Sequence, residues 1–122
     1  AGQNASDERL KTNIIEFDDK FDNIFDDLKP VKFEYSKDFL GKGAHFGYIA
    51  QDVVKSFENE GESIDDYSFI YRAEIEDNSD EQYYQLNKSD FIALNTWQIQ
   101  KLKARIEELE NKLEALEGND TK

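Results

Sequence analysis

A narrow repeat of large aliphatic residues near the carboxyl end most constrains what this chain can form. The spacings alternate between three and four residues, which places the members at heptad positions a and d: Ile99, Leu102, Ile106, Leu109, Leu113 and Leu116. A helix that packs on its own domain usually presents a wider apolar stripe, whereas supercoiled helices bury a two-in-seven seam. The repeat therefore predicts a long oligomerisation helix over residues 89–118, ended by Gly118 and followed by a frayed tail at 119–122.

The charged residues beside the seam indicate how such helices would align. In a parallel, in-register coil, Arg105 faces Glu110 of a neighbour and Lys112 faces Glu117, so opposite charges meet at both levels. Each exposed pair contributes only about 0.2–1 kcal/mol, so the pairs select orientation more than they stabilise. Isoleucine at a with leucine at d favours two strands. A single helix lying on its own domain is the alternative.

Composition excludes several classes of function. The 122 residues carry a formal net charge of -13, which disfavours binding to nucleic acid or to an anionic membrane. The chain has no cysteine and one histidine, so neither a disulfide nor a multi-histidine metal site is expected, and we expect no cofactor. Nine phenylalanines, six tyrosines and a tryptophan are typical of a packed core and not of a disordered tail.

Upstream of the seam, the periodicities predict a small globular part over residues 6–88. An acidic amphipathic helix is expected from Thr12 to Leu28 and ends before Pro30, because proline lacks an amide donor. The other expected elements are strands at Val31–Tyr35 and Phe46–Ile49, a helix at Gln51–Phe57, and a hairpin of Ser68–Ile75 with Gln82–Leu86 around a turn at 77–80. The fold class is thus α+β, with a long C-terminal helix.

Ser6 and Lys11 are the two residues whose chemistry is best suited to catalysis. A serine hydroxyl becomes a nucleophile when a neighbouring base takes its proton, and a desolvated lysine can serve. Five residues along a helix separate two side chains by about 140°, and along a strand they point to opposite faces. A Ser6–Lys11 contact therefore requires a bend between them, or a lysine from another chain. The alternative is that Ser6 only caps a short helical turn.

Three ordered motifs stand out along the chain: the first is Ser6 to Ile14, the second is the Pro30–Tyr35 strand, and the third is His45 to Val53. Together they resemble the intramolecular chaperone auto-processing domains found at the C-termini of phage tail spikes, tail fibres and neck appendages, including endosialidases. The helix from Phe91 to Leu116 resembles the C-terminal helix of that family.

The resemblance implies a parallel homotrimer that aligns the chains of an upstream β-rich fibre and then releases itself. Ser6 would be the nucleophile and Lys11 the general base of a serine–lysine dyad, and the cut would fall between Ala5 and Ser6. Asp7, Arg9, Asn13, His45 and Gln51 belong to the same motifs and are expected only to shape the site. Residues 1–5 would then be the end of the fibre or a remnant of expression.

By the same resemblance, this self-cleaving serine endopeptidase would act in the host cytoplasm during virion assembly and leave the mature fibre after the cut. Two other functions are alternatives to the self-cleaving chaperone. One is a structural oligomerisation cap without chemistry, and the other is a binding module that uses its hairpin or acidic helix. His45 likewise has two possible roles, a structural one in a backbone turn and one in proton transfer.

Overall fold

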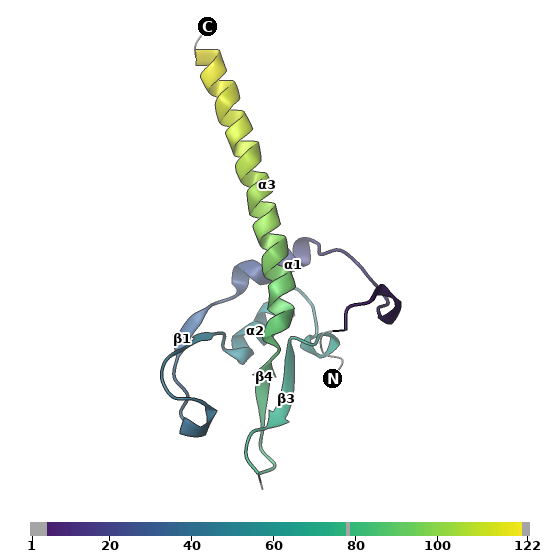
Figure 1. Ribbon diagram of the computed structural model, residues 1–122, viewed down its shortest axis with the longest axis vertical. Coiled ribbons are helices and arrows are strands. Elements are labelled where there is room, and N and C mark those ends of the chain that lie inside the picture. Colours follow the sequence, from purple (N-terminus) through teal and green to yellow (C-terminus); the bar gives the residue numbers. More distant parts are fainter. Residues whose placement is uncertain (1–4, 78, 121–122) are drawn as a thin grey trace.

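A computed structural model describes residues 5–77 and 79–120 of the chain. Figure 1 shows a small globular part from which one long helix projects. Along the chain the elements are η1 (Glu8–Leu10), α1 (Asp19–Asp27), β1 (Val31–Phe33), η2 (Asp38–Leu40), β2 (His45–Gly47), α2 (Ala50–Glu58), η3 (Ile64–Asp66), β3 (Ile70–Glu74), β4 (Gln82–Leu86) and α3 (Lys88–Asp120). The predicted α+β class with a long C-terminal helix is confirmed.

The strands form two separate antiparallel hairpins. β1 pairs with β2, with Val31 opposite Gly47. β3 pairs with β4, with Ile70 opposite Leu86 and Ala73 opposite Tyr83, as the predicted hairpin requires. Asn78, in the predicted turn, lies outside the described residues, as do residues 1–4 and 121–122, which include parts of the predicted upstream remnant and frayed tail.

The first helix is shorter than its apolar spacing predicts. α1 begins at Asp19, and the carboxylate of Asp18 caps it by accepting from the Lys20 amide at 3.1 Å. Residues 11–18 are in neither a helix nor a strand. The helix prediction from Thr12 was wrong because Asn13 adopts a left-handed backbone, with φ of 53°, and Asp18 favours the cap over the helix interior.

The other boundaries shift by a few residues. The first two strands are shorter than predicted, and α2 starts one residue earlier, at Ala50. The long helix passes through Gly118 to Asp120, so the predicted stop at Gly118 was wrong. Among the described glycines, positive φ occurs only at Gly41, Gly43 and Gly61, so Gly118 does not form the left-handed cap that often ends a helix.

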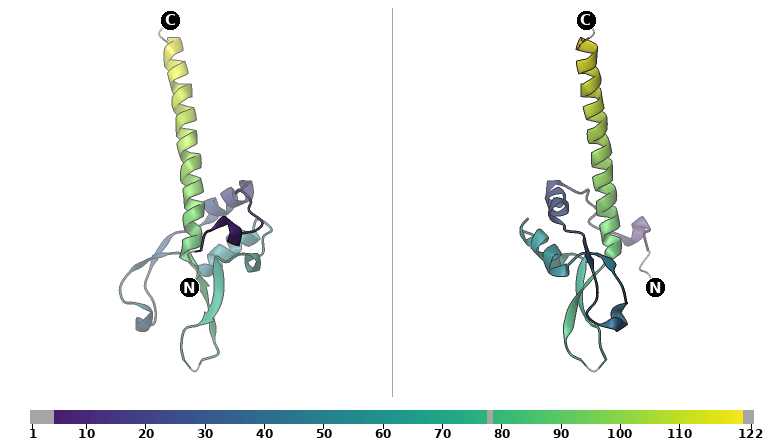
Figure 2. Two further views of the ribbon diagram at one scale, coloured as in Figure 1. Left: turned by 45° about the vertical axis from the view of Figure 1, so that its right-hand side comes forward. Right: turned by 90° about the vertical axis from the view of Figure 1, so that its left-hand side faces the viewer.

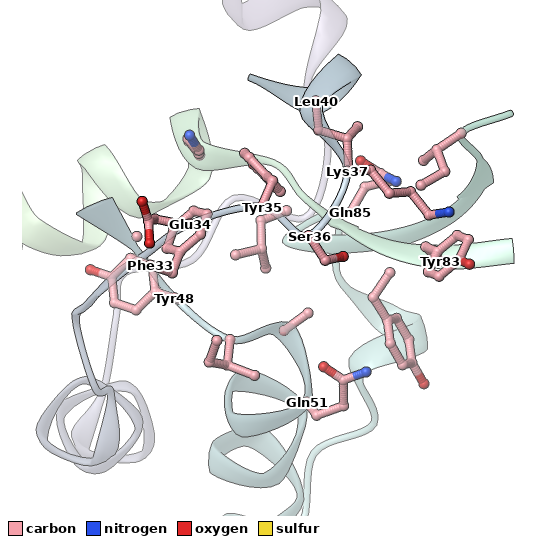
Figure 3. A pocket seen from close by; sticks show the side chains of 17 residues that line it. Phe33, Glu34, Tyr35, Ser36, Lys37, Leu40, Tyr48, Gln51, Tyr83 and Gln85 are labelled. Atoms are coloured by element: carbon pink, nitrogen blue, oxygen red, sulfur yellow. The ribbon is translucent and has the colours of Figure 1, made fainter. Parts of the chain in front are cut away.

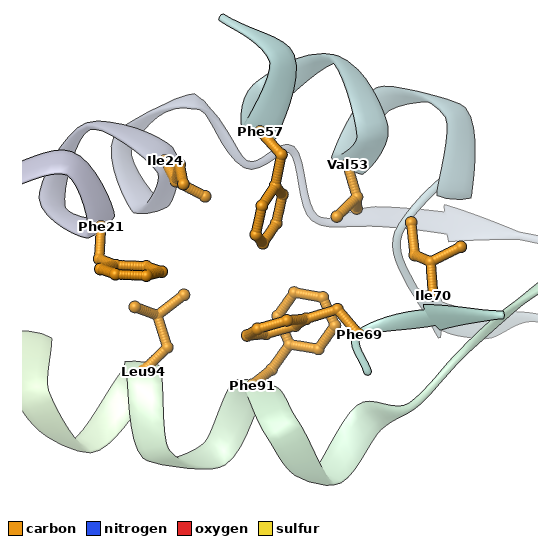
Figure 4. Close-up of a cluster of buried hydrophobic side chains, with 8 residues drawn as sticks. All are labelled: Phe21, Ile24, Val53, Phe57, Phe69, Ile70, Phe91 and Leu94. Carbon is orange, nitrogen blue, oxygen red and sulfur yellow. The ribbon is translucent and has the colours of Figure 1, made fainter. Parts of the chain in front are cut away.

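The core lies where α1, α2, the start of β3 and the first turns of α3 meet (Figure 4). Its buried side chains are Phe21, Ile24, Val53, Phe57, Phe69, Ile70, Phe91 and Leu94. The rings of Phe57 and Phe69 are 5.3 Å apart, and those of Phe69 and Phe91 are 4.8 Å apart. The beginning of α3 is therefore part of the globular core, while its later turns extend beyond it.

A polar junction fixes α1 to α3 at the edge of this core. Asp22 accepts from Gln98 Nε2 at 2.6 Å and from Lys101 Nζ at 2.8 Å, and Gln98 is buried. The hydrogen bond from Gln98, followed by that from Lys101, lowers the pKa of Asp22 below its ordinary value. The Lys101 ammonium also lies 4.7 Å from the centre of the Trp97 ring. The junction holds α1 against the side of α3.

Removing a core ring tests this packing. Phe57→Ala should lower the free energy of unfolding by about 3–5 kcal/mol, because Phe57 is 1% exposed and a cavity would replace it. The matched control Phe39→Ala removes a ring that is 61% exposed and should change it by no more than about 0.5 kcal/mol. Urea unfolding at one fixed chain concentration measures both. Equal losses would contradict the assigned core.

The junction predicts a loss of stability in acid. Because the folded pKa of Asp22 is lowered, its contribution is present above the unfolded pKa of about 3.9 and disappears as pH falls through the folded value. Asp22→Asn should therefore destabilise the chain by about 1 kcal/mol at pH 7 and by much less at pH 2. Urea unfolding at the two pH values gives the difference, with exposed Asp26→Asn as the control. A pH-independent effect would contradict the role of the carboxylate.

Candidate functional site

Ser6 and Lys11 are in direct contact. Lys11 Nζ donates to Ser6 Oγ at 2.7 Å. The bend that the sequence analysis required is the single turn η1, closed by hydrogen bonds from the Leu10 amide to the Asp7 carbonyl at 3.0 Å and from the Lys11 amide to the Glu8 carbonyl at 3.2 Å. A lysine and a serine from the same chain can therefore meet without help from a second chain.

Asp7 and Arg9 hold the turn between them. Asp7 caps η1 by accepting from the Arg9 amide at 2.9 Å, and its carboxylate also accepts from Arg9 Nε at 3.0 Å and Nη2 at 2.8 Å. The side-chain hydrogen bond with Arg9 lowers the pKa of Asp7, and the same bond raises the pKa of Arg9. This planar, two-pronged pair restricts the backbone between Ser6 and Lys11.

Asn13 redirects the chain after the pair. Its φ of 53° lies in the left-handed region, which asparagine enters more readily than most residues other than glycine. The left-handed residue lies two positions after Lys11, the C-terminal cap of η1, in the stretch of residues 11–18 that leads to α1 without helix or strand. The left-handed backbone therefore explains why asparagine occupies this position, whether or not its side chain takes part in chemistry.

Ser6 and Lys11 are both exposed in the single chain. A lysine acts as a base only when its amine is neutral, and removal from water favours the neutral form. The isolated chain thus supplies the contact between the two groups but not the shielding from water that base catalysis by lysine needs.

His45 and Gln51 lie away from this pair. In Figures 1 and 2 the β1–β2 hairpin and η1 are on different sides of α3. The His45 ring packs against Phe33 and Tyr35, with centroids 5.7 and 5.0 Å away, and its Nε2 is buried with no hydrogen-bond partner among the described residues. A Cβ on Gly41 would come within 3.2 Å of that ring, so the glycine allows the close approach. These contacts favour the structural role for His45.

Gln51 points into a groove of about 500 Å³ between the two hairpins (Figure 3). Tyr35, Tyr48, Tyr83 and Leu86 are among its lining residues. Within one chain, therefore, the structure brings together Ser6, Asp7, Arg9 and Lys11, and it places His45 and Gln51 in a second region. Among the described residues, no group of three or more acidic or histidine side chains is arranged to hold a metal ion.

The a/d seam of α3 has no partner among the described residues of the chain. Its six residues, from Ile99 to Leu116, are between 47% and 63% exposed, and the later ones lie along the part of α3 that stands clear of the globular domain (Figure 2). Arg105 and Lys112 both pair with Glu108 of the same helix, at 3.1 and 3.2 Å. No helix in the described part of the chain is long and apolar enough to cross a membrane.

The Asp22–Gln98 contact was missed by the sequence analysis. The two residues are 76 positions apart, and Gln98 occupies a flanking heptad position where a polar side chain is ordinarily exposed. Only the widening of the apolar stripe near Phe91, Leu94 and Trp97 indicates that this part of the helix packs on the globular domain. That pattern identifies the packed face but not its partner.

A family model and a solved structure both relate this chain to intramolecular chaperones. Residues 6–62 match a peptidase family model described as chaperone of endosialidase. A solved structure described as the crystal structure of a novel intramolecular chaperone superposes with a TM-score of 0.64 at 28% sequence identity, covering 82% of this chain and 99% of that one. No curated protein matches the chain.

The left-handed backbone at residue 13 is directly testable. Asn13→Gly should leave the free energy of unfolding within about 0.5 kcal/mol of the original, whereas Asn13→Val should lower it by about 1–2 kcal/mol, because a β-branched residue is strained at positive φ. Urea unfolding of both variants distinguishes backbone strain from loss of the amide side chain. If Asn13→Gly and Asn13→Val lower the free energy of unfolding equally, the left-handed backbone of Asn13 does not explain the contribution of this residue to stability.

Proposed function

We propose that this chain, whose residues 6–62 match the chaperone of endosialidase model, trimerises, assists the folding of a β-rich fibre upstream, and then cuts itself free. The single observation that carries the cutting step is the 2.7 Å contact between Lys11 Nζ and Ser6 Oγ. The match to the family model begins at Ser6 itself, immediately after the proposed cut.

The exposed a/d seam supports the trimeric part of the proposal. Three chains joined through α3 would bury six half-exposed aliphatic side chains each. Pairing strands from three chains is slow, because distant segments must meet before any contact stabilises them. A coiled coil forms locally and holds the tethered chains at an effective concentration in roughly the millimolar range. The upstream partner would be a phage tail spike or tail fibre.

The proposed cleavage proceeds through an ester. Lys11, as the neutral amine, takes the proton from Ser6 Oγ, and the oxygen attacks the carbonyl carbon of Ala5. The Ala5–Ser6 C–N bond breaks, the nitrogen receives a proton, and the Ala5 acyl group is left on Oγ. Water then hydrolyses this ester. The products are a carboxylate at Ala5 and a free amino group at Ser6, with one water consumed.

Shielding from water would come from the assembled trimer, since both groups are exposed in the single chain. We place the cut in the host cytoplasm during virion assembly, where release would leave the fibre to persist by its own unfolding barrier. The exposure of Ser6 and Lys11 also favours a second candidate, an oligomerisation cap of a trimeric fibre that does no chemistry.

Intact mass separates the two candidates. The chain fused to its upstream segment should lose that segment and begin at Ser6, whereas Ser6→Ala and Lys11→Ala should remain full length, with the rate lowered by roughly 10³-fold or more. Lys11→Arg should also fail, because arginine keeps its charge and cannot accept the proton. Ser36→Ala, which changes another exposed serine that precedes a lysine, should cleave normally. If the unsubstituted fusion also keeps its full-length mass while it is folded and trimeric, the cleavage proposal is contradicted and the oligomerisation cap remains.

A further inference from the structure

The d positions of α3 become polar toward the globular part of the chain. Counting back in sevens from Leu102, they are Asn95 and then Lys88. The a positions over the same turns remain aliphatic, as Ile99 and Ile92. Asn95 is therefore an amide between two isoleucine positions of the seam, with a lysine at the next d position toward the start of the helix.

Asn95 lies on a side of α3 that the chain's own core leaves free. Phe91 and Leu94 are buried and point into that core (Figure 4). Asn95 is exposed, and its side chain makes no hydrogen bond to any of the described residues. Ile92, Asn95 and Ile99 lie within about 60° of one another around the helix. This face continues the a/d seam, so the proposed trimer would direct all three Asn95 side chains toward its axis.

Three amides around one axis cannot satisfy all their donors among themselves. Each Asn95 has two N–H groups and one carbonyl oxygen. If each amide donates to the oxygen of the next around the three-fold axis, one N–H is left on each chain. Isoleucine layers on both sides exclude water, and a buried donor without an acceptor is destabilising. The layer therefore requires an acceptor on the axis that can serve three N–H groups.

A compact anion meets this requirement better than a water molecule or a cation. A water oxygen has two lone pairs for the three donors and adds two hydrogens of its own to the layer. A cation would bind the amide oxygens and leave the N–H groups unpaired. An anion can accept from all three N–H groups, and hydrogen bonds to a charged partner are stronger than those between neutral groups.

The charged residue at the seam favours an anion as well. Between residues 88 and 101 the charged side chains are Lys88, Asp90 and Lys101. Asp90 and Lys101 lie outside the seam positions and have partners on their own chain, Ser68 and Asp22. Lys88 is at a d position, about 10 Å along the helix from the amide seven residues later. The trimer would thus place three ammonium groups near the end of the seam closest to the amide layer.

From these positions we propose that the three Asn95 side chains of the assembled protein bind one compact anion, of halide size, on the axis of the coiled coil. The inference rests on the proposed trimer and adds a ligand to it. The amide layer also sets the register of the helices. A shift by one heptad would place Asn95 beside Leu102 of a neighbouring chain and leave the amides without partners.

Bromide dependence of unfolding tests the site. Asn95→Ala removes the axial amide, and the control Asn111→Ala removes an exposed amide at an outward position of the same helix. Urea unfolding is measured at one chain concentration and one ionic strength, with sodium bromide replacing sodium methanesulfonate. The equilibrium constant for unfolding of the trimer into separate chains should fall by up to about ten-fold for each ten-fold rise in bromide, because one ion binds per trimer. Asn111→Ala should respond alike, and Asn95→Ala should lose the response.

Sedimentation equilibrium on the same samples separates the anion site from the proposed trimer. Trimers that respond equally to bromide with and without the Asn95 amide would overturn the site and leave the proposed function intact. A chain that stays monomeric at every bromide concentration would overturn both.

Diffraction locates the ion without any substitution. Crystals of the unsubstituted chain grown in sodium bromide should show an anomalous difference peak on the three-fold axis, between the Ile92 and Ile99 layers and within hydrogen-bonding distance of the three Asn95 Nδ2 atoms. A trimer with no bromide at this level of the axis would overturn the site, even where bromide binds elsewhere on its surface.

Discussion

The packing of Phe91 and Leu94 into the globular core is the interaction on which the rest of the structure depends. It fixes α3 by its first turns, and the Asp22–Gln98 junction secures the same side of the helix against α1. With that face occupied, the a/d seam is directed outward along the whole free length of α3. A parallel bundle formed through the seam would carry the three globular parts outside it, each at the same level.

This arrangement would relate the proposed oligomer to the Ser6–Lys11 pair. The pair depends on one short turn, held by Asp7 and Arg9, and is exposed in a single chain. The chain that follows Lys11 next meets α3 at Phe17, whose ring lies 5.3 Å from that of Trp97. A site of this kind would gain its environment from neighbouring chains, which suits a reaction that has to follow assembly and occur once in each chain.

The sequence predicted some levels of the structure better than others. The seam and the β3–β4 hairpin were predictable because each follows from local periodicity and turn chemistry. The first helix was overextended because Ile14 and Phe17 share the helical spacing of α1, while the left-handed backbone of Asn13 cannot be read from that spacing. The need for a bend between Ser6 and Lys11 was predictable, and a short helical turn was one of the alternatives, but the residue that caps η1 is Asp7 and not Ser6. Contacts such as Asp22–Gln98 depend on how distant elements pack, so no local pattern contains them.

Sedimentation equilibrium of the chain is the most direct test of the central idea that α3 assembles three copies. The proposed trimer predicts a single species of three times 14.2 kDa over a range of chain concentrations, because joining three copies through the seam would remove the six aliphatic residues of each α3 from water. A monomer or a dimer across the same range would contradict it.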